Sequence, residues 1–219
     1  MKKKILFITD SLGLPRLQPE TVLYEETYIY LCKKEFLEYD FIDLCIGGGT
    51  ITTLASQLLY YLAVNPDLVI VQSGIVDCAP RALGRREMAL LNSNAIIGNI
   101  SKVILKPFLP FLRKYRGQTS TTITAFETNI DKFLKIFNNI PVYWNLIVPA
   151  TDKYEEQIPG IRKNIIQYNQ IIQAKLGNNY IDNADVKDGM LMSDFHHLNK
   201  EGHANLFNKI GNIIKIARF

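Results

Sequence analysis

The residues best suited to chemistry lie at opposite ends of the chain. Ser11 follows a short apolar run, 5–8, and Asp194 and His197 lie in the segment SDFHHLNKEGH near the C-terminus. A serine hydroxyl is a poor nucleophile unless a base lies within hydrogen-bond reach and an acid orients that base. His197 and Asp194, three residues apart in a turn that enters a helix, can supply that pair. The pattern predicts serine-dependent acyl chemistry if the fold brings the two ends together.

Each part of this pattern also has a structural alternative. A serine after a strand is often a helix N-cap or turn residue, and a glycine run such as 47–49 often forms a tight turn. The three histidines of the chain, His196, His197 and His203, all lie in the C-terminal segment. Together with Asp194 they also allow a metal site, although no HExxH-type spacing supports it. We predict that neither a metal nor an organic cofactor is required.

The elements that must position these residues follow from the apolar pattern. Short apolar runs typical of buried strands lie at 5–8, 41–46, 68–71 and 142–148, with a weaker one near 180–181. Helical spacing occurs between them, at about 20–36, 51–63, 122–137, 161–176 and 200–216. This alternation predicts an α/β fold, a three-layer α/β/α sandwich around a mainly parallel five-stranded sheet. Ligands of such sheets bind at the carboxyl ends of the strands, where TDS, GGGT and QSGIVD occur.

The segment 81–117 is the least regular part of the chain. It is rich in large apolar residues, is interrupted by Pro107 and Pro110, and ends with three basic residues, Arg113, Lys114 and Arg116. We favour a pair of amphipathic helices that pack on the sheet. The alternatives are a mobile cap over the active site or a surface that contacts a membrane or an acyl chain. We place no domain boundary, so 1–219 is expected to be one domain with 81–117 as its candidate cap.

The overall composition excludes several classes of protein. The net charge of +4 comes from 25 basic and 21 acidic residues mixed along the chain, which argues against a nucleic-acid partner. The three cysteines show no CxxC spacing and are expected to be reduced, buried thiols. No window approaches the roughly 18 apolar residues of a spanning helix. The apolar run after MKKK is shorter than the roughly 7–15 residues of a signal peptide, so we expect a cytoplasmic protein.

The order of the motifs resembles the SGNH hydrolases, the GDSL esterase and lipase superfamily. Asp10, Ser11 and Leu12 match the GDSL block after the first strand, and Gly48 matches the glycine after the second. Gly74 and Asp77 match the GxND block after the third strand, and the string DxxHLNxxGH, residues 194–203, is the most specific match. More narrowly, QSGIVDCAPR and DSLGLPR look similar to SGNH proteins encoded with bacterial surface-polysaccharide synthesis enzymes.

The resemblance implies a role for each matched residue. Ser11 would be the nucleophile, His197 the base and Asp194 the residue that orients it, while the backbone amides of Ser11 and Gly48 would form the oxyanion hole. We assign the remaining residues to substrate binding: Asp10, Gly74, Asp77 and Arg81. A guanidinium suits recognition of a carboxylate or phosphate, and for Arg81 the alternative is a solvated side chain at a helix start.

Two positions depart from the family pattern. Thr9 replaces the first glycine of the first block, which is a mild change, and Val76 stands where GxND has its asparagine. A valine cannot donate a hydrogen bond, so one donor of the oxyanion hole is missing. The expected activity is removal of an acyl group, an O-acetyl group above all, from a saccharide through an acyl-Ser11 intermediate. The alternatives are a saccharide O-acyltransferase with the same triad and a non-catalytic saccharide-binding protein.

Overall fold

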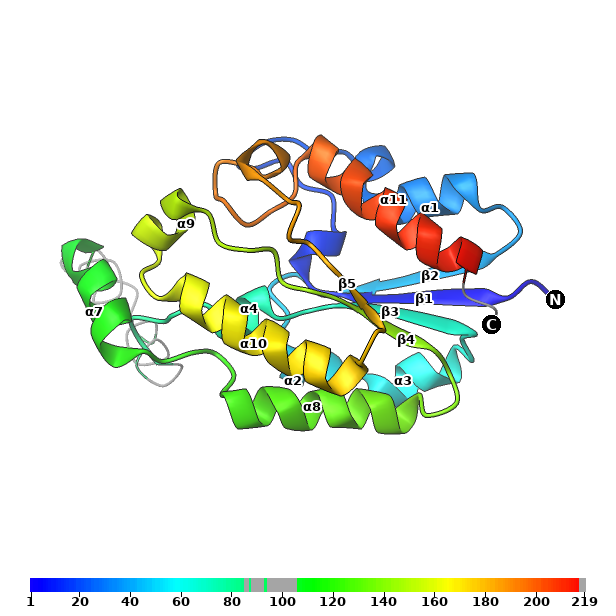
Figure 1. Cartoon of the computed structure of the whole chain (residues 1–219), viewed down its shortest axis with the longest axis horizontal. Helices are drawn as coiled ribbons and strands as arrows, with labels where there is room; N and C mark the ends of the chain where they lie inside the picture. Colours follow the sequence, from blue (N-terminus) through cyan, green and yellow to red (C-terminus); the bar gives the residue numbers. More distant parts are fainter. Residues whose placement is uncertain (85–86, 88–92, 94–105, 217–219) are drawn as a thin grey trace.

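A central sheet of five parallel strands organises the chain in a computed structural model, which describes residues 1–84, 87, 93 and 106–216 (Figure 1). In the order β2-β1-β3-β4-β5, the strands are β2 (Asp40–Cys45), β1 (Lys4–Thr9), β3 (Leu68–Gln72), β4 (Val142–Asn145) and β5 (Tyr180–Ile181). β1 pairs with β2 on one side and with β3 on the other, so that Thr9 lies beside both Cys45 and Gln72. The predicted fold class is confirmed.

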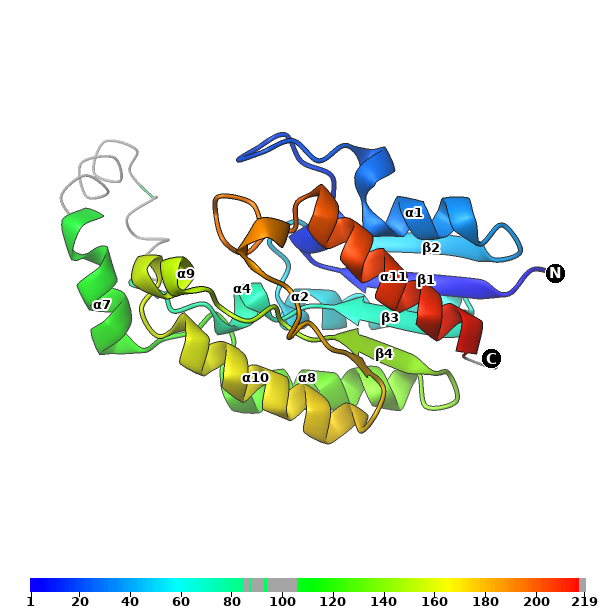
Figure 2. The same cartoon turned by 45° about the horizontal axis from the view of Figure 1, so that its top comes forward.

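Helices cover both faces of the sheet. Because both faces of the central strands β1 and β3 are buried, these strands consist almost entirely of apolar residues. One face carries α1 (Tyr28–Glu35) and α11 (Lys200–Ile216). The other carries α2 (Ile51–Ala55), α3 (Leu58–Ala63), α8 (Ile123–Ile136) and α10 (Ile161–Leu176). Three further helices lie toward the carboxyl ends of the strands: α4 (Ile75–Cys78), α7 (Leu109–Arg116) and α9 (Asp152–Gln157) (Figure 2).

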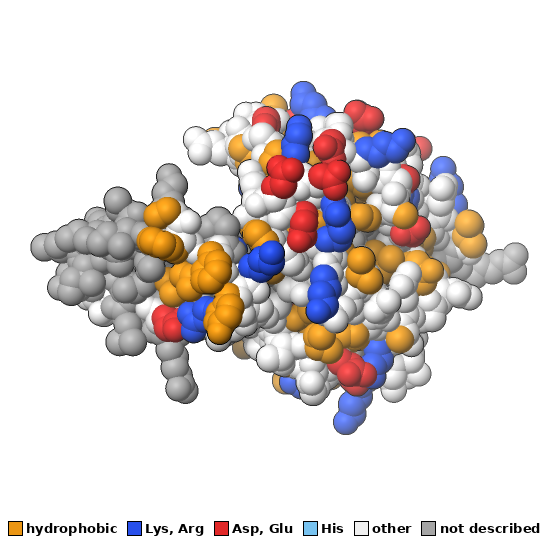
Figure 3. Space-filling model, turned by 60° about the vertical axis from the view of Figure 1, so that its left-hand side comes forward, with side chains coloured by type: hydrophobic (Ala, Val, Ile, Leu, Met, Phe, Trp, Pro, Cys, Tyr) orange, Lys and Arg blue, Asp and Glu red, His pale blue; other side chains and the backbone are white. Residues whose placement is uncertain are grey.

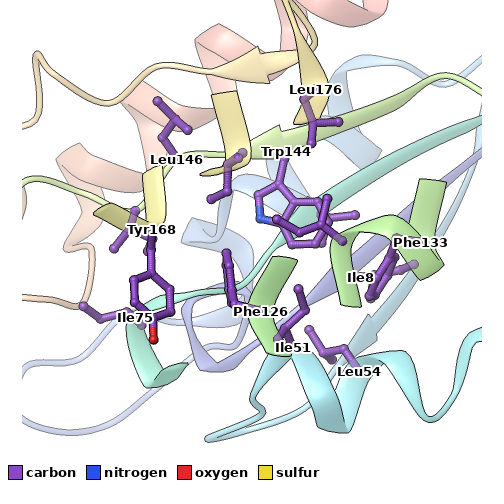
Figure 4. Close-up of a cluster of buried hydrophobic side chains, with 14 of the residues drawn as sticks. Ile8, Ile51, Leu54, Ile75, Phe126, Phe133, Trp144, Leu146, Tyr168 and Leu176 are labelled. Carbon is purple, nitrogen blue, oxygen red and sulfur yellow. The ribbon is translucent and has the colours of Figure 1, made fainter. Parts of the chain in front are cut away.

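Two apolar clusters, one on each face, form the core. The cluster beneath α8 and α10 contains Trp144, which is fully buried and meets Phe133 edge-on with ring centroids 5.3 Å apart (Figure 4). Phe126 and Tyr168 pack beside them, with ring centroids 4.8 Å apart. Burial of each such side chain contributes about 1.5–3 kcal/mol. These contacts make the sheet a rigid support for the loops at its carboxyl edge.

Three predicted boundaries were wrong, and local hydrogen bonds explain two of them. The helix expected from residue 20 begins only at Tyr28, because Arg16 and Val22 exchange two backbone hydrogen bonds of 2.9 Å that close the loop between them. The helix expected over 51–63 is two helices, α2 and α3. The strand expected over 142–148 ends at Asn145, because the backbone N–H and C=O of Ile147 pair with the side-chain amide of Asn169.

Most of the predicted helix pair in 81–117 falls on residues 85–86, 88–92 and 94–105, outside the described residues. The part that is described includes a turn of 3₁₀ helix, Lys106–Phe108, and α7. On α7, Phe111 and Tyr115 are exposed and stack with ring centroids 6.0 Å apart. Within the described ranges, no helix is both long and apolar enough to cross a membrane.

Candidate active site

The nucleophile candidate lies in a sharp turn directly after β1. Ser11 opens a single turn of 3₁₀ helix, Ser11–Gly13, and Asp10 caps that turn because its Oδ1 accepts a hydrogen bond from the Leu12 amide at 3.0 Å. The Asp10 amide in turn donates to the Gln72 carbonyl at the end of β3, at 3.0 Å. Ser11 is therefore held at the carboxyl edge of the two central strands, and its side chain is partly exposed.

The histidine and aspartate candidates lie in the loop before α11, and their short spacing allows one carboxylate to hold the whole turn. Asp194 Oδ1 accepts hydrogen bonds from the amides of His196 and His197 at 3.2 and 3.0 Å. Phe195, between them, has a φ of 61°, in the left-handed region. Asp194 Oδ2 lies 2.6 Å from Nδ1 of the His197 ring. The three-residue offset thus turns both side chains to the same side.

Residues 186 positions apart meet at this point: Ser11 Oγ lies 3.3 Å from His197 Nε2. The structure brings together the three residues that the sequence suggested, in the order serine, histidine, aspartate. This distance is slightly longer than a strong hydrogen bond, as is common when no substrate is bound.

The protonation states follow from the surroundings of Asp194. Burial acts to raise the pKa of this carboxyl group, but the hydrogen bonds from His197 outweigh burial and hold the pKa well below its usual range. An ionised carboxylate only accepts hydrogen bonds, so Nδ1 of His197 carries the proton that it donates. Nε2 is then a free acceptor for the Ser11 hydroxyl proton. The arrangement is that of a general base poised beside a nucleophile.

The two backbone donors expected for an oxyanion lie in the turns that follow the neighbouring strands β1 and β2. Gly48 is exposed at the tip of a turn after β2, where the Gly49 amide donates to the Ile46 carbonyl at 3.0 Å. Its φ of 67° lies in the region that favours glycine. The amides of Ser11 and Gly48 have no hydrogen-bond acceptor among the described residues. Both N–H groups are available for a developing negative charge.

The position of the third donor is occupied by Val76 in the short helix α4. Val76 is half-buried and packs against the apolar cluster beneath α8 and α10. The preceding Gly74 has a φ of 140°, and a Cβ there would lie 2.6 Å from Ile147 Cδ1. Only glycine fits this close approach. Gly74 thereby sets the start of α4, and its contact with substrate stays a prediction.

The structure gives Asp10 and Asp77 supporting roles in place of the predicted contacts with substrate, since both side chains are fully buried. Asp77 accepts hydrogen bonds from the Ile51 amide, at 3.1 and 3.0 Å, and from the hydroxyls of Ser73 and Thr121. Burial raises the pKa of Asp77, and these hydrogen bonds oppose the rise. Asp77 joins the ends of β2, β3 and the loop before α8.

Arg81 follows α4 and is exposed. Its Nε donates to Ser120 Oγ at 2.9 Å, and its Nη2 donates to the Val76 carbonyl at 3.4 Å. The guanidinium is thus held against the backbone of Val76, the residue that replaces the asparagine. A contact between Arg81 and substrate stays a prediction.

The other two histidines have different surroundings from His197. His203 is buried, accepts a hydrogen bond from the Tyr28 amide at 3.3 Å, and stacks on the Tyr28 ring. Burial, with a smaller contribution from Arg16, lowers the pKa of His203 to about 4, so its ring is neutral. Nδ1 of His203 is taken by the Tyr28 amide, and among the described residues the ligand atoms that lie close to Asp194 belong to His196 and His197, so His203 does not join Asp194 as the metal alternative required.

Asp194, His196 and His197 do have ligand atoms within 4.8 Å of one another. Three of the four ring nitrogens already have partners: His196 Nδ1 with the Asp194 carbonyl at 2.9 Å, and both nitrogens of His197 within the triad. A cation bound here would have to break the Asp194–His197 bond. The geometry suits proton transfer better than metal binding.

Three residues of the site were missed by the sequence analysis: Arg16, Glu20 and Tyr154. Both carboxylate oxygens of Glu20 accept a hydrogen bond from the Ser193 amide at 3.1 Å, which ties the loop 16–22 to the segment that carries Asp194. Tyr154 of α9 stacks on His196 with ring centroids 5.5 Å apart. Arg16 Nη2 lies 3.5 Å from the Ser11 carbonyl. Only Arg16 had a signal in the sequence, because it ends the DSLGLPR block.

Two small cavities, each with about 10 Å³ of room, lie beside the triad. The first is lined mainly by apolar side chains: Leu12, Ile75, Ile147, Val148, Tyr154, Phe195 and His196. The second lies behind the nucleophile turn and receives two buried polar atoms without partners, Asp10 Oδ2 and Asn145 Nδ2. The first cavity offers an apolar wall to a small acyl group, and the second has the size and polarity to hold one water molecule.

The parallel sheet, the serine turn after β1 and the Asp–His loop before the last helix occur in a fold that the chain shares with solved GDSL lipases and esterases. Among solved structures, the chain is similar to a lipase/acylhydrolase from Enterococcus faecalis, with a TM-score of 0.67 at 19% identity over 97% of this chain and 95% of that one. The acetyl xylan esterase AlAXEase gives 0.62 at 21% identity, over 96% and 99% of the two chains. The esterase EstA from Pseudoalteromonas sp. gives 0.62 at 16%, over 98% and 97%.

These likenesses extend over nearly the whole chain and confirm the SGNH fold. No family model matches the sequence, and no curated protein matches it. The identities lie between 16% and 21%, so the fold is shared while most side chains differ.

Proposed function

We propose that the protein is a serine-dependent carboxylic ester hydrolase. The observation that carries the proposal is the continuous chain of contacts from Ser11 Oγ to His197 Nε2 and from His197 Nδ1 to the ionised Asp194. Ser11 attacks the ester carbonyl while His197 takes its proton, and the amides of Ser11 and Gly48 hold the oxyanion. His197 then returns the proton to the leaving alcohol, which leaves acyl-Ser11. Water, activated by the same base, releases the acid.

A small acyl group, such as acetyl on a saccharide hydroxyl, is the proposed substrate. The apolar cavity beside His196 admits about one water-sized group, so it offers no room for a fatty acyl chain. AlAXEase, of similar fold, is described as an acetyl xylan esterase. A sugar hydroxyl in place of the deacylating water would make the same site an O-acyltransferase, so acceptor sugars belong in the assay.

Val76 favours a second candidate, a saccharide-binding protein that keeps the fold but turns over slowly. Loss of one oxyanion-hole donor costs about a hundred- to a thousand-fold in turnover. The ionised Asp194 and the correctly oriented His197 argue for the enzyme, because a binding protein has no need to activate Ser11.

A fluorophosphonate probe separates the two candidates. An enzyme should label with one equivalent at Ser11, read by intact mass and peptide mapping, and Ser11→Ala should not label. Acetate release from acetylated saccharides, with and without an acceptor sugar, then distinguishes hydrolysis from transfer. Absence of labelling in a folded wild-type protein would reject the hydrolase and support the binding protein.

A further inference from the structure

The arginines of the protein divide into two groups. Of the five that the structure describes, two form ion pairs, Arg116 with Glu87 and Arg162 with Asp152. The other three have no carboxylate oxygen within 4.0 Å in the described ranges: Arg16, Arg81 and Arg113. Residues 85–86, 88–92, 94–105 and 217–219, which are not described, contain neither Asp nor Glu, so no acidic side chain there can serve as a partner.

The three unpaired guanidiniums all contact segments that form the active site. Arg16 Nη2 lies 3.5 Å from the carbonyl of Ser11, and Arg81 Nη2 lies 3.4 Å from that of Val76. Arg113 Nη1 donates to the carbonyl of Gln157 at 3.2 Å, at the end of α9. Figure 3 shows this end of the molecule, where basic, acidic and hydrophobic side chains lie side by side.

Electrostatic effects agree with this placement. Burial lowers the pKa of Arg16, and the charges of Asp194 and Asp10 oppose that shift. Burial raises the pKa of Tyr154, which stacks on His196; Arg81 and Arg113 oppose that rise. Arg16 is therefore close enough to Asp194 to interact with its charge, and Arg81 and Arg113 are close enough to interact with Tyr154.

Arg16 is the best placed of the three to contact a bound ester. It is half-buried, and the two backbone hydrogen bonds between Arg16 and Val22 fix the position of its main chain. Its guanidinium makes two long hydrogen bonds to carbonyls, 3.3 Å to Gln18 and 3.5 Å to Ser11. The acid of the same loop, Glu20, is engaged with the Ser193 amide. A guanidinium has five N–H donors and keeps its charge, so Arg16 retains donors for an anion.

We propose that the active site takes acidic esters, and that Arg16 binds a carboxylate or phosphate group of the substrate while Ser11 attacks the acyl carbon. This inference rests on the proposed function and narrows its substrate class to anionic molecules such as acylated uronic acids or sugar phosphates. A planar guanidinium binds either group through two parallel hydrogen bonds. Arg81 and Arg113 add positive potential that attracts the same ligands.

Four acetyl esters test the proposal by their kcat/KM: acetylated glucose, acetylated glucuronate, acetylated glucose 6-phosphate and neutral 4-nitrophenyl acetate. Wild type should prefer at least one acidic ester over acetylated glucose by about tenfold or more. Arg16→Gln should lower kcat/KM for that ester about 10- to 100-fold, the range expected for a lost hydrogen bond to a charged group, and leave the neutral esters within about threefold. Comparing the two acidic esters identifies a carboxylate or a phosphate as the group bound.

Arg162→Gln is the matched control, because Arg162 is paired with Asp152 and should leave the preference unchanged. Equal losses on acidic and neutral esters in Arg16→Gln, or no preference in wild type, would overturn the proposal.

A binding measurement keeps this result separate from that of the proposed function. In Ser11→Ala, glucuronate or inorganic phosphate should raise the melting temperature, and the shift should disappear in Ser11→Ala/Arg16→Gln. A shift that survives the Arg16 change, or no shift with either anion, counts against the anion site. Anion binding without phosphonate labelling of wild type would instead retain the anion site and reject the hydrolase.

Discussion

His197 differs from its two neighbouring histidines in what each ring nitrogen contacts. His197 links Asp194 to Ser11, whereas His203 accepts a hydrogen bond from the Tyr28 amide and His196 stacks on Tyr154. Residue type and spacing alone do not separate these roles. The contacts lead to distinct expectations for each substitution.

We expect His197→Ala to abolish acyl release, with a loss of at least about a thousandfold in kcat, because no other base contacts the Ser11 hydroxyl in the part of the chain that the structure describes. Asp194→Asn should retain weak activity. His203→Ala should mainly lower the melting temperature, since its ring is buried and neutral. Turnover of an activated ester and thermal unfolding by circular dichroism measure both effects. A folded His203→Ala or His196→Ala variant as inactive as His197→Ala would show that the base is misassigned.

Val76 leads to the second prediction at this scale. Gln72 and Arg81 are the donors nearest to Val76 in the sequence that could replace the missing asparagine of the oxyanion hole. Gln72 is buried and its side chain is held by the Tyr28 hydroxyl, which donates to Oε1 at 2.6 Å, so Gln72 is a poor substitute. We expect Val76→Asn to raise kcat on 4-nitrophenyl acetate by about tenfold or more, toward the hundred- to thousand-fold value of a full donor.

Val76→Leu, close in size to asparagine but without a donor, is the control for that change and should give no gain. An unchanged Val76→Asn, together with an Arg81→Ala variant that has lost most of its turnover, would mean that Arg81 already supplies the donor.

At the scale of the elements, Asp77 is the junction on which the site depends. Its carboxylate binds the first amide of α2, the Ser73 hydroxyl after β3 and the Thr121 hydroxyl before α8. The turn that carries Gly48 leads directly into α2. The position of an oxyanion-hole amide is therefore coupled to a carboxylate that itself does no chemistry.

We expect Asp77→Ala to lower the free energy of unfolding by about 2–4 kcal/mol, because a buried amide and two hydroxyls lose their acceptor. It should also lower kcat without a matching change in KM, since the Gly48 turn loses its anchor. Asp77→Asn, which keeps one acceptor oxygen, should lie between. Urea denaturation and steady-state kinetics measure these effects. A stability change below about 0.5 kcal/mol would contradict the junction role.

At the scale of the whole molecule, the buried Asp10 should make stability depend on pH. Burial, helped by the nearby charge of Asp77, raises the pKa of Asp10 to about 7. The folded state then holds a proton that the unfolded chain releases near pH 4. The contribution of Asp10 to stability is complete below about pH 4 and is lost as the pH rises to about 7.

Asp10→Asn removes this titration and tests the effect. The difference in unfolding free energy between wild type and Asp10→Asn should change between about pH 4 and 7, by roughly 4 kcal/mol at most, and stay constant above. Taking the difference also cancels the opposite effect of His203, whose lowered pKa makes the wild type less stable below about pH 6.5. A difference independent of pH would show that Asp10 is ionised in the folded protein.

The sequence by itself determined the layers of the fold and the identity of the triad candidates. Strands such as β1 and β3, and helices such as α10 and α11, carry periodic apolar patterns that depend only on near neighbours in the chain. The alternation of these patterns then restricts the sheet to parallel strands with their carboxyl ends at one edge. Ser11 and His197 could be placed at that edge because each directly follows or precedes such an element.

Only the tertiary structure decided which polar residues support the site and which face a ligand. Asp10 and Asp77 were assigned to substrate in the sequence, but contacts with segments far along the chain bury both. Arg16 lacks a carboxylate partner because Glu20, the acid of its own loop, binds the Ser193 amide instead. Glu20 and Ser193 are 173 residues apart in the sequence. Burial and ion pairing are properties of the packed chain. Composition and spacing fix which groups are present, and packing fixes which of them remain free to bind.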